Sequence, residues 1–248
     1  TMKSAYIPQW GQYVATSPQG DVRVKVDFAA SGNKMKLSVR NTIYDAAGKM
    51  VAKSQGVQEQ KLQVKNPHLW DIGKGYLYTV KSELLVNGKV VDVATTTAGF
   101  RDVKFDAKKG FFLNGKNLKI NGVCEHHDFG CLGAAVNEDA MHRKLTILRD
   151  MGVNAIRSSH NPPAPELLNM CDSMGFLVMD ESFDMWRRKK SNGDYARFFD
   201  EWHKKDLSDL IKRDRNHPSI IMWSIGNEVL EQWSDAAADT LSLEQANL

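Results

Sequence analysis

The 248-residue chain has little of what marks several classes of protein. Its three cysteines, Cys124, Cys131 and Cys171, match no zinc-binding spacing and leave one thiol over, so neither a metal centre nor a disulfide framework is indicated. No apolar run reaches the roughly 18 residues of a transmembrane helix. The N-terminal segment also lacks the apolar core of a secretion signal. These absences favour a chain that folds without metal or disulfides and does not enter a membrane.

A large excess of charge of one sign is also missing. The 33 lysines and arginines and the 30 aspartates and glutamates are spread along the whole chain. No basic patch therefore indicates a nucleic-acid partner or a membrane-surface partner. With 42% hydrophobic and 25% charged residues, the composition is that of an ordinary folded protein.

The first part of the chain has the period-two pattern of half-buried β-strands. Between Val22 and Phe28 apolar side chains occur at every second position, and the alternation recurs around residues 35–39 and 76–80. Turn-forming residues separate these runs at spacings that favour antiparallel hairpins. About seven such strands predict an immunoglobulin-like β-sandwich over residues 1–98.

The second part, residues 99–248, alternates short apolar runs with amphipathic helices. We expect the first helix to begin after an Asn137 cap and to bury Met141 and Leu145 on one face. The apolar run that contains Trp223 is interpreted as a strand buried on both faces, with the tryptophan in the core. About four βα units in succession predict the first half of a parallel (β/α)8 barrel.

Polar side chains follow each of the expected strands of this barrel. The carboxyl ends of parallel barrel strands meet at one rim, where reactive groups collect. The polar groups at these ends are Cys124–Asp128, Arg157–Asn161, Asp180–Glu181 and Asn227–Glu228. Together they can place acids, bases and hydrogen-bond donors around a polar ligand.

Each of these candidates also has a plainer structural explanation. A carboxylate such as Glu228 after a strand is often a helix cap or a solvated turn residue. His126 and His127 could be loop residues or a metal pair, although adjacent histidines in a loop lack the spacing of helical metal motifs. Arg157 could contact a substrate, or it could neutralise a carboxylate inside the barrel.

Five segments resemble the signatures of glycoside hydrolase family 2, which contains β-galactosidases, β-glucuronidases and β-mannosidases. The segments are GFRDVKF, NLKINGV, NAIRSSHNP, CDSMGFLVMDE and RDRNHPSIIMWSIGNE. The resemblance extends from Leu69 to about Leu248. It implies an immunoglobulin-like domain followed by a (β/α)8 barrel, hydrolysis of a β-glycoside with retention of configuration, and no cofactor.

The resemblance also implies roles for individual residues. Glu228 corresponds to the general acid/base, and Asn227 to the residue that hydrogen-bonds the sugar 2-hydroxyl. The other candidates fall where the family lines its sugar site, namely His126, His127, Asp128, Arg157 and His160. The expected partner is a β-linked carbohydrate, with a β-galactoside favoured over a β-glucuronide or β-mannoside. The alternative of another class is a non-catalytic carbohydrate-binding or interaction module.

Two features of the family pattern are missing from this sequence. A retaining glycosidase needs a second carboxylate as nucleophile, which the resemblance assigns to a seventh barrel strand beyond Leu248. The Glu-x-His magnesium pair of many β-galactosidases is replaced by Met185 and Arg187, so no metal site is expected. We therefore expect a segment of a longer hydrolase that is inactive by itself and forms homo-oligomers through exposed sheet edges. A periplasmic or secreted parent is compatible with the sequence.

Overall fold

The computed structural model describes residues 5–31 and 35–233, which form two compact units. The first unit extends to Lys119 and includes residues 172–175 and 215–218, and the second contains the remaining described residues. These units are defined by how compactly the chain packs, and they do not test where one domain ends and the next begins. The domain boundary expected between residues 98 and 99 therefore stays a prediction.

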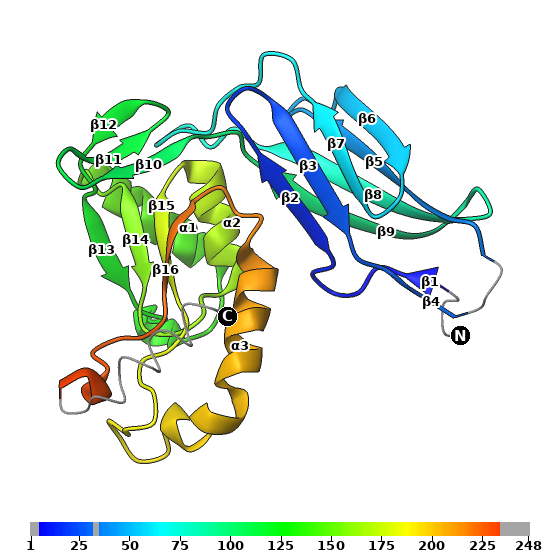
Figure 1. Cartoon of the computed structure of the whole chain (residues 1–248). Helices are drawn as coiled ribbons and strands as arrows, with labels where there is room; N and C mark the ends of the chain where they lie inside the picture. The colour runs from blue at the N-terminus through cyan, green and yellow to red at the C-terminus, as the bar shows by residue number, and fades with distance from the viewer. Residues whose placement is uncertain (1–4, 32–34, 234–248) are drawn as a thin grey trace. The chain divides into compact units, whose positions relative to one another are not determined.

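The first unit contains two antiparallel sheets that form an immunoglobulin-like β-sandwich, as predicted (Figure 1). One sheet has the order β2-β3-β7 and the other the order β6-β5-β8-β9. Their strands are β2 (Gln12–Thr16), β3 (Asp21–Val26), β5 (Leu37–Tyr44), β6 (Met50–Gly56), β7 (Glu59–Gln63), β8 (Tyr78–Val86) and β9 (Lys89–Ala98). Two shorter pairings complete the unit, namely β1 (Ala5–Tyr6) with β4 (Ala29–Ala30), and a sheet of β10 (Val103–Asp106), β11 (Gly110–Leu113) and β12 (Lys116–Leu118).

The period-two pattern explains how the sandwich forms its core. In β3, Val22, Val24 and Val26 are buried, while the residues between them are exposed. Successive side chains of a strand point to opposite faces of the sheet, so this alternation gives β3 one apolar face. The valines of that face pack with buried residues of the other strands, including Ile43 and Leu84, in one hydrophobic cluster.

The second unit contains a parallel sheet of order β13-β14-β15-β16, which is the start of a TIM barrel, as predicted (Figure 1). Its strands are β13 (Gly122–Glu125), β14 (Ala155–Ser158), β15 (Leu177–Glu181) and β16 (Ile220–Ser224). The helices between them are α1 (Glu138–Asp150), α2 (Pro165–Met174) and α3 (Phe199–Asp214), with short 3₁₀ helices η1 (Gly130–Leu132), η2 (Tyr195–Arg197) and η3 (Leu230–Trp233). None of the helices in the described residues has the length and apolar character needed to span a membrane.

Helix α1 begins where the sequence indicates. Asn137 is its N-cap, and the side-chain Oδ1 accepts the backbone N–H of Ala140 at 2.9 Å. Acidic residues occupy the first turn, where the positive end of the helix dipole favours them. Met141 and Leu145 are buried on one face. Capping and a 3.6-residue period are therefore sufficient to predict this helix.

The prediction for strand β16 is wrong in one respect. Ile220 is buried, but Ile221 and Met222 are only half-buried, and Trp223 is 40% exposed instead of lying in the core. Burial on both faces requires a packing layer on each side of the sheet. In the described part of the chain β16 pairs only with β15, and an apolar hollow of about 210 Å³ lies along the sheet.

Candidate active site

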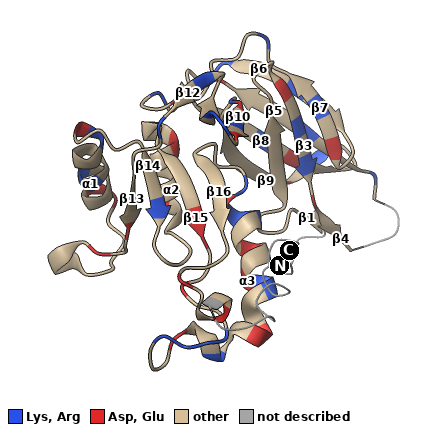
Figure 2. Cartoon of the chain, turned by 60° about the vertical axis from the view of Figure 1, so that its left-hand side comes forward, with Lys and Arg blue, Asp and Glu red and all other residues tan. Residues whose placement is uncertain are grey.

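The centre of the candidate site is the buried carboxylate of Glu181, at the end of β15. Its Oε2 accepts hydrogen bonds from Arg157 Nε at 2.9 Å, from Arg157 Nη2 at 2.6 Å and from Ser224 Oγ at 2.6 Å. Its Oε1 lies 2.7 Å from His160 Nδ1, and its backbone N–H donates to Ser158 Oγ at 2.8 Å. Figure 2 shows the basic position on β14 beside the acidic end of β15. Both carboxylate oxygens of Glu181 are therefore hydrogen-bonded, and the side chain connects β15 to residues of β14 and β16 and of the loop after β14.

Sequence reasoning included Glu181 among the polar strand ends but not among the candidate site residues. Its side chain is 0% exposed, and four hydrogen bonds converge on its two oxygens. A carboxylate that is enclosed in this way can organise its neighbours but cannot reach a substrate. In the sequence, only the position of Glu181 at the end of a strand indicated that it belongs to the site. Its burial, which the sequence does not show, gives it a structural role.

Arg157 makes the ion pair that was one of its two expected roles. Partial burial opposes the charge of Arg157, but the hydrogen bonds that it donates to Glu181 raise the pKa of the guanidinium above its ordinary value. Its Nη2 also donates to Asn227 Oδ1 at 2.9 Å. Arg157 thus connects the buried carboxylate to the segment after β16. Contact with a substrate stays a prediction.

Asn227 lies between a cationic donor and an anionic acceptor. Its Oδ1 accepts from Arg157, and its Nδ2 donates to Asp184 Oδ1 at 2.9 Å. Because a guanidinium can only donate and a carboxylate can only accept, these partners determine which way the amide points. The backbone N–H of Asn227 donates to Phe183 O at 3.0 Å. Asn227 retains a second N–H that could donate to a ligand.

A lysine and an aspartate of the loop after β15 support this segment, and sequence reasoning did not find them. Lys190 Nζ donates to Asp184 Oδ1 at 2.8 Å, to Asp184 O at 2.7 Å and to Asn227 O at 2.8 Å. Partial burial opposes ionisation of Asp184, but the hydrogen bonds from Lys190 and Asn227 lower its pKa below the ordinary value. Lys190 belongs to the basic run Arg187–Lys190, and such a run is typical of a solvated surface.

Glu228 follows Asn227 directly, at the carboxyl end of β16. Its side chain is exposed, and its backbone φ is +43°, in the left-handed region. Residues other than glycine adopt this region rarely, and such conformations are common at functional sites. The carboxylate is thus presented to solvent on a backbone that the surrounding structure must hold in place.

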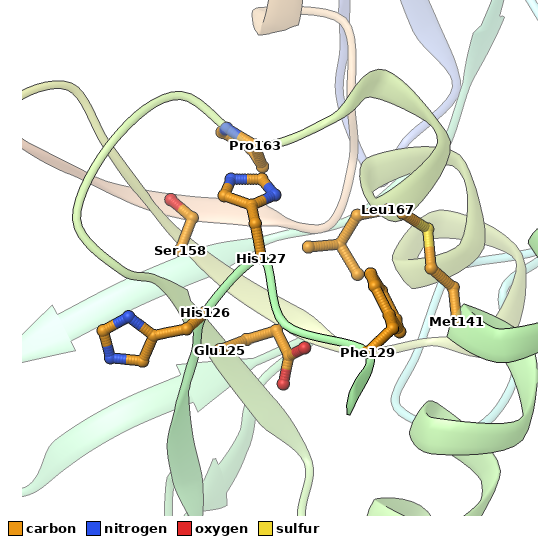
Figure 3. A pocket seen from close by; sticks show the side chains of 8 residues that line it. All are labelled: Glu125, His126, His127, Phe129, Met141, Ser158, Pro163 and Leu167. Atoms are coloured by element: carbon orange, nitrogen blue, oxygen red, sulfur yellow. The ribbon is translucent and has the colours of Figure 1, made fainter. Parts of the chain in front are cut away.

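The two adjacent histidines point in different directions (Figure 3). The His126 ring makes an edge-to-face contact with His160, with the ring centroids 5.1 Å apart. Both histidines border a small pocket whose other lining residues are Glu125, Phe129, Met141, Ser158, Pro163 and Leu167. Among residues 5–31 and 35–233, no group of three histidine, cysteine, aspartate or glutamate side chains is placed to hold a metal ion.

Asp128 stabilises the loop after β13. Its Oδ1 accepts the backbone N–H of Gly130 at 2.9 Å, and its backbone carbonyl accepts Lys144 Nζ at 2.8 Å. Lys144 also pairs with the carboxylate of Glu125. The structure thus gives Asp128 a role in the shape of the loop, and a role in sugar binding stays a prediction.

The structure brings three predicted residues, Arg157, His160 and Asn227, together around Glu181, and His126 joins them through its contact with His160. A parallel barrel sheet with charged and polar groups at the carboxyl ends of its strands is typical of barrel enzymes that act at this rim. The family comparisons agree with that class. The model described as "Glycosyl hydrolases family 2, TIM barrel domain" matches residues 103–245, and "Glycosyl hydrolases family 2" matches residues 6–101. The chain belongs to glycoside hydrolase family 2.

Individual relatives agree with this membership. A β-galactosidase of Bacteroides ovatus is 54% identical over 98% of this chain, and a putative β-glucuronidase of Formosa agariphila is 44% identical over 85%. A solved structure of a family 2 member from Bacteroides cellulosilyticus is 38% identical, with a TM-score of 0.91 over 98% of this chain. The chain spans 30%, 21% and 33% of the lengths of these three proteins.

Proposed function

We propose that the protein to which this chain belongs hydrolyses terminal β-galactosides with retention of configuration. In this proposal Glu228 protonates the departing glycosidic oxygen and then activates water as a base. Asn227 donates a hydrogen bond to the sugar 2-hydroxyl. The observation that carries the proposal is the pair itself, in which an exposed carboxylate follows an amide whose orientation is set by Arg157 and Asp184.

The reaction also needs a nucleophile. Retaining glycosidases use two carboxyl groups about 5 to 5.5 Å apart, one as acid/base and one to attack the anomeric carbon. Glu181 is unsuited to attack because it is 0% exposed and its oxygens are occupied by Arg157, His160 and Ser224. We therefore expect the nucleophile outside the 248 residues, and we expect little or no turnover by the chain alone.

The choice of a galactoside is supported by the relative from Bacteroides ovatus, which carries the name β-galactosidase at 54% identity. A β-glucuronide is the second candidate, because the relative from Formosa agariphila at 44% identity carries the name putative β-glucuronidase. The values of kcat/KM for nitrophenyl β-galactoside and nitrophenyl β-glucuronide would decide between the two. A higher value for the glucuronide would refute the galactoside assignment.

The role of Glu228 is tested by Glu228→Gln in the protein encoded by the complete reading frame. General acid catalysis contributes roughly 10² to 10⁴-fold, and it contributes most when the leaving group is a poor one. We expect a loss of that size in kcat/KM on an alkyl β-galactoside and a much smaller loss on dinitrophenyl β-galactoside. Equal losses on both substrates would contradict the acid/base role.

A further inference from the structure

The loop between β15 and η2 holds one of its lysines in a defined position. The carboxylate of Asp194 accepts the backbone N–H groups of Lys190 at 2.8 Å, Ser191 at 2.9 Å and Ala196 at 3.1 Å. These hydrogen bonds lower the pKa of Asp194, so it remains a carboxylate at neutral pH. The backbone at Lys190 is thereby fixed, and its side chain extends from an ordered turn.

All three N–H donors of the Lys190 ammonium group have acceptors within the protein. The three acceptor oxygens are Asp184 Oδ1, Asp184 O and Asn227 O, at 2.7 to 2.8 Å. The Lys190 side chain is 21% exposed. In the same basic run Arg187 pairs with Asp200 and Arg188 donates to Leu230 O, but both side chains are exposed, as is that of Lys189.

One of the three acceptors, the carbonyl oxygen of Asn227, belongs to the peptide unit that precedes Glu228. The carbonyl of Asn227 and the amide nitrogen of Glu228 belong to the same planar peptide unit. The orientation of this plane sets the φ angle of Glu228, which is +43° and unfavourable for a residue with a Cβ atom. The hydrogen bond from Lys190 to Asn227 O at 2.8 Å holds the plane in that orientation.

The residues before Asn227 are fixed by other groups. Trp186 Nε1 donates to Ile225 O at 2.8 Å. At Gly226 a Cβ atom would lie 2.8 Å from Trp186 Nε1, so only glycine fits beside this ring. The N–H of the next peptide, between Gly226 and Asn227, donates to Phe183 O, and Lys190 contacts the peptide after it, between Asn227 and Glu228.

We propose that Lys190 and Asp184 are positioning residues that hold Glu228 and Asn227 in their reactive geometry. Lys190 fixes the peptide plane between Asn227 and Glu228, and Asp184 holds both the ammonium group and the amide of Asn227. In this proposal neither residue contacts the substrate, and both act through Asn227 and Glu228. The inference rests on the proposed acid/base role of Glu228.

The test is Lys190→Met in the full-length enzyme, with Lys189→Met as the matched control. Lys189 is the exposed neighbour in the same basic run, and it does not share the contacts of Lys190. Misplacing a catalytic group by about 1 Å can cost about 100-fold in rate. We expect Lys190→Met to lower kcat/KM on ethyl β-galactoside about 100-fold, and less than about 10-fold on dinitrophenyl β-galactoside. Lys189→Met should leave both values unchanged.

A purely structural role would not produce this pattern. Assays run well below the melting temperature of each variant compare folded enzymes, and loss of stability alone cannot discriminate between leaving groups. A crystal structure of Lys190→Met supplies a second measurement, in which Glu228 should leave the left-handed region. Glu228 retained near its present φ would overturn the inference.

Failure of this inference can be distinguished from failure of the proposed function. If Glu228→Gln discriminates between the two substrates and Lys190→Met does not, the positioning role is wrong and the acid/base role stands. If Glu228→Gln itself does not discriminate, the acid/base role in the proposed function is wrong. The crystal structure of Lys190→Met then decides the positioning role on its own.

Discussion

Removal of the cation from the buried ion pair is the sharpest test of how the site is held together. In Arg157→Met the Glu181 carboxylate, which is 0% exposed, loses both hydrogen bonds from the guanidinium. Asn227 Oδ1 loses a donor in the same variant. Methionine preserves much of the volume of the side chain, so the loss reports mainly on charge and hydrogen bonding.

The expected magnitude follows from the surroundings of Glu181. Removing one partner of a buried ion pair costs about 3 to 5 kcal/mol because the other charge remains buried and unpaired. His160 and Ser224 still contact the carboxylate, and the Arg157 side chain is itself 29% exposed. We therefore expect the low end, about 3 kcal/mol. For a chain of this size that corresponds to a fall in melting temperature of roughly 6 to 12 °C.

The assay is thermal and urea unfolding of the purified chain in four forms, namely unaltered, Arg157→Met, Glu181→Gln and the double variant. The neutral glutamine removes the uncompensated charge, so the double variant should lose less stability than the two single losses added together. Arg143→Met replaces an exposed arginine of α1 and serves as the control. Unfolding of Arg157→Met that matches this control, or strict additivity in the double variant, would refute the reasoning.

Three further predictions concern the folded chain. Burial, and then the neighbouring charge of Asp214, raise the pKa of Asp180 to about 8. The unfolded state releases this proton near pH 4 and the folded state near pH 8, so stability falls between these values, by at most about 1.4 kcal/mol per pH unit. Asp180→Asn should remove that fall in urea unfolding measured from pH 4 to 8. Asn137→Ala deletes the α1 cap and should cost about 1 kcal/mol, whereas Asn137→Asp should restore it. Finally, the purified chain should dimerise or aggregate in light scattering, because exposed strand edges favour association.

Each of these predictions has an outcome that contradicts it. Asp150→Asn replaces an exposed carboxylate and serves as the control for Asp180→Asn. If stability depends on pH in the same way in both variants, Asp180 is not protonated in the folded state. Equal melting temperatures for Asn137→Ala and Asn137→Asp would mean that the cap contributes nothing. A monomer at high concentration would count against association through the sheet edges.

Local features of the sequence determined the order and type of the elements. The alternation in β3 and the capped, apolar face of α1 are patterns within a few residues of one another, and each expresses the geometry of a single strand or helix. The order of βα units then predicted a barrel whose strand ends meet at one rim. That rule predicted that the strand ends carrying Arg157, His160 and Asn227 would be neighbours, and the resemblance to glycoside hydrolase family 2 singled out these three residues.

The tertiary structure alone decided how these side chains are paired. Arg157 meets Asn227 across 70 positions in the chain, and Lys190 meets Asn227 across 37. No local pattern distinguishes Lys190 from the other basic residues of its run, because the difference lies in which acceptors the fold brings within hydrogen-bonding distance. Likewise, Glu181 is the last residue of β15 and Glu228 comes shortly after β16, but Glu181 is enclosed by donors and Glu228 is exposed. The burial and the hydrogen-bond partners of each glutamate depend on residues far away in the sequence. These two properties distinguish the buried Glu181 from Glu228, the proposed acid.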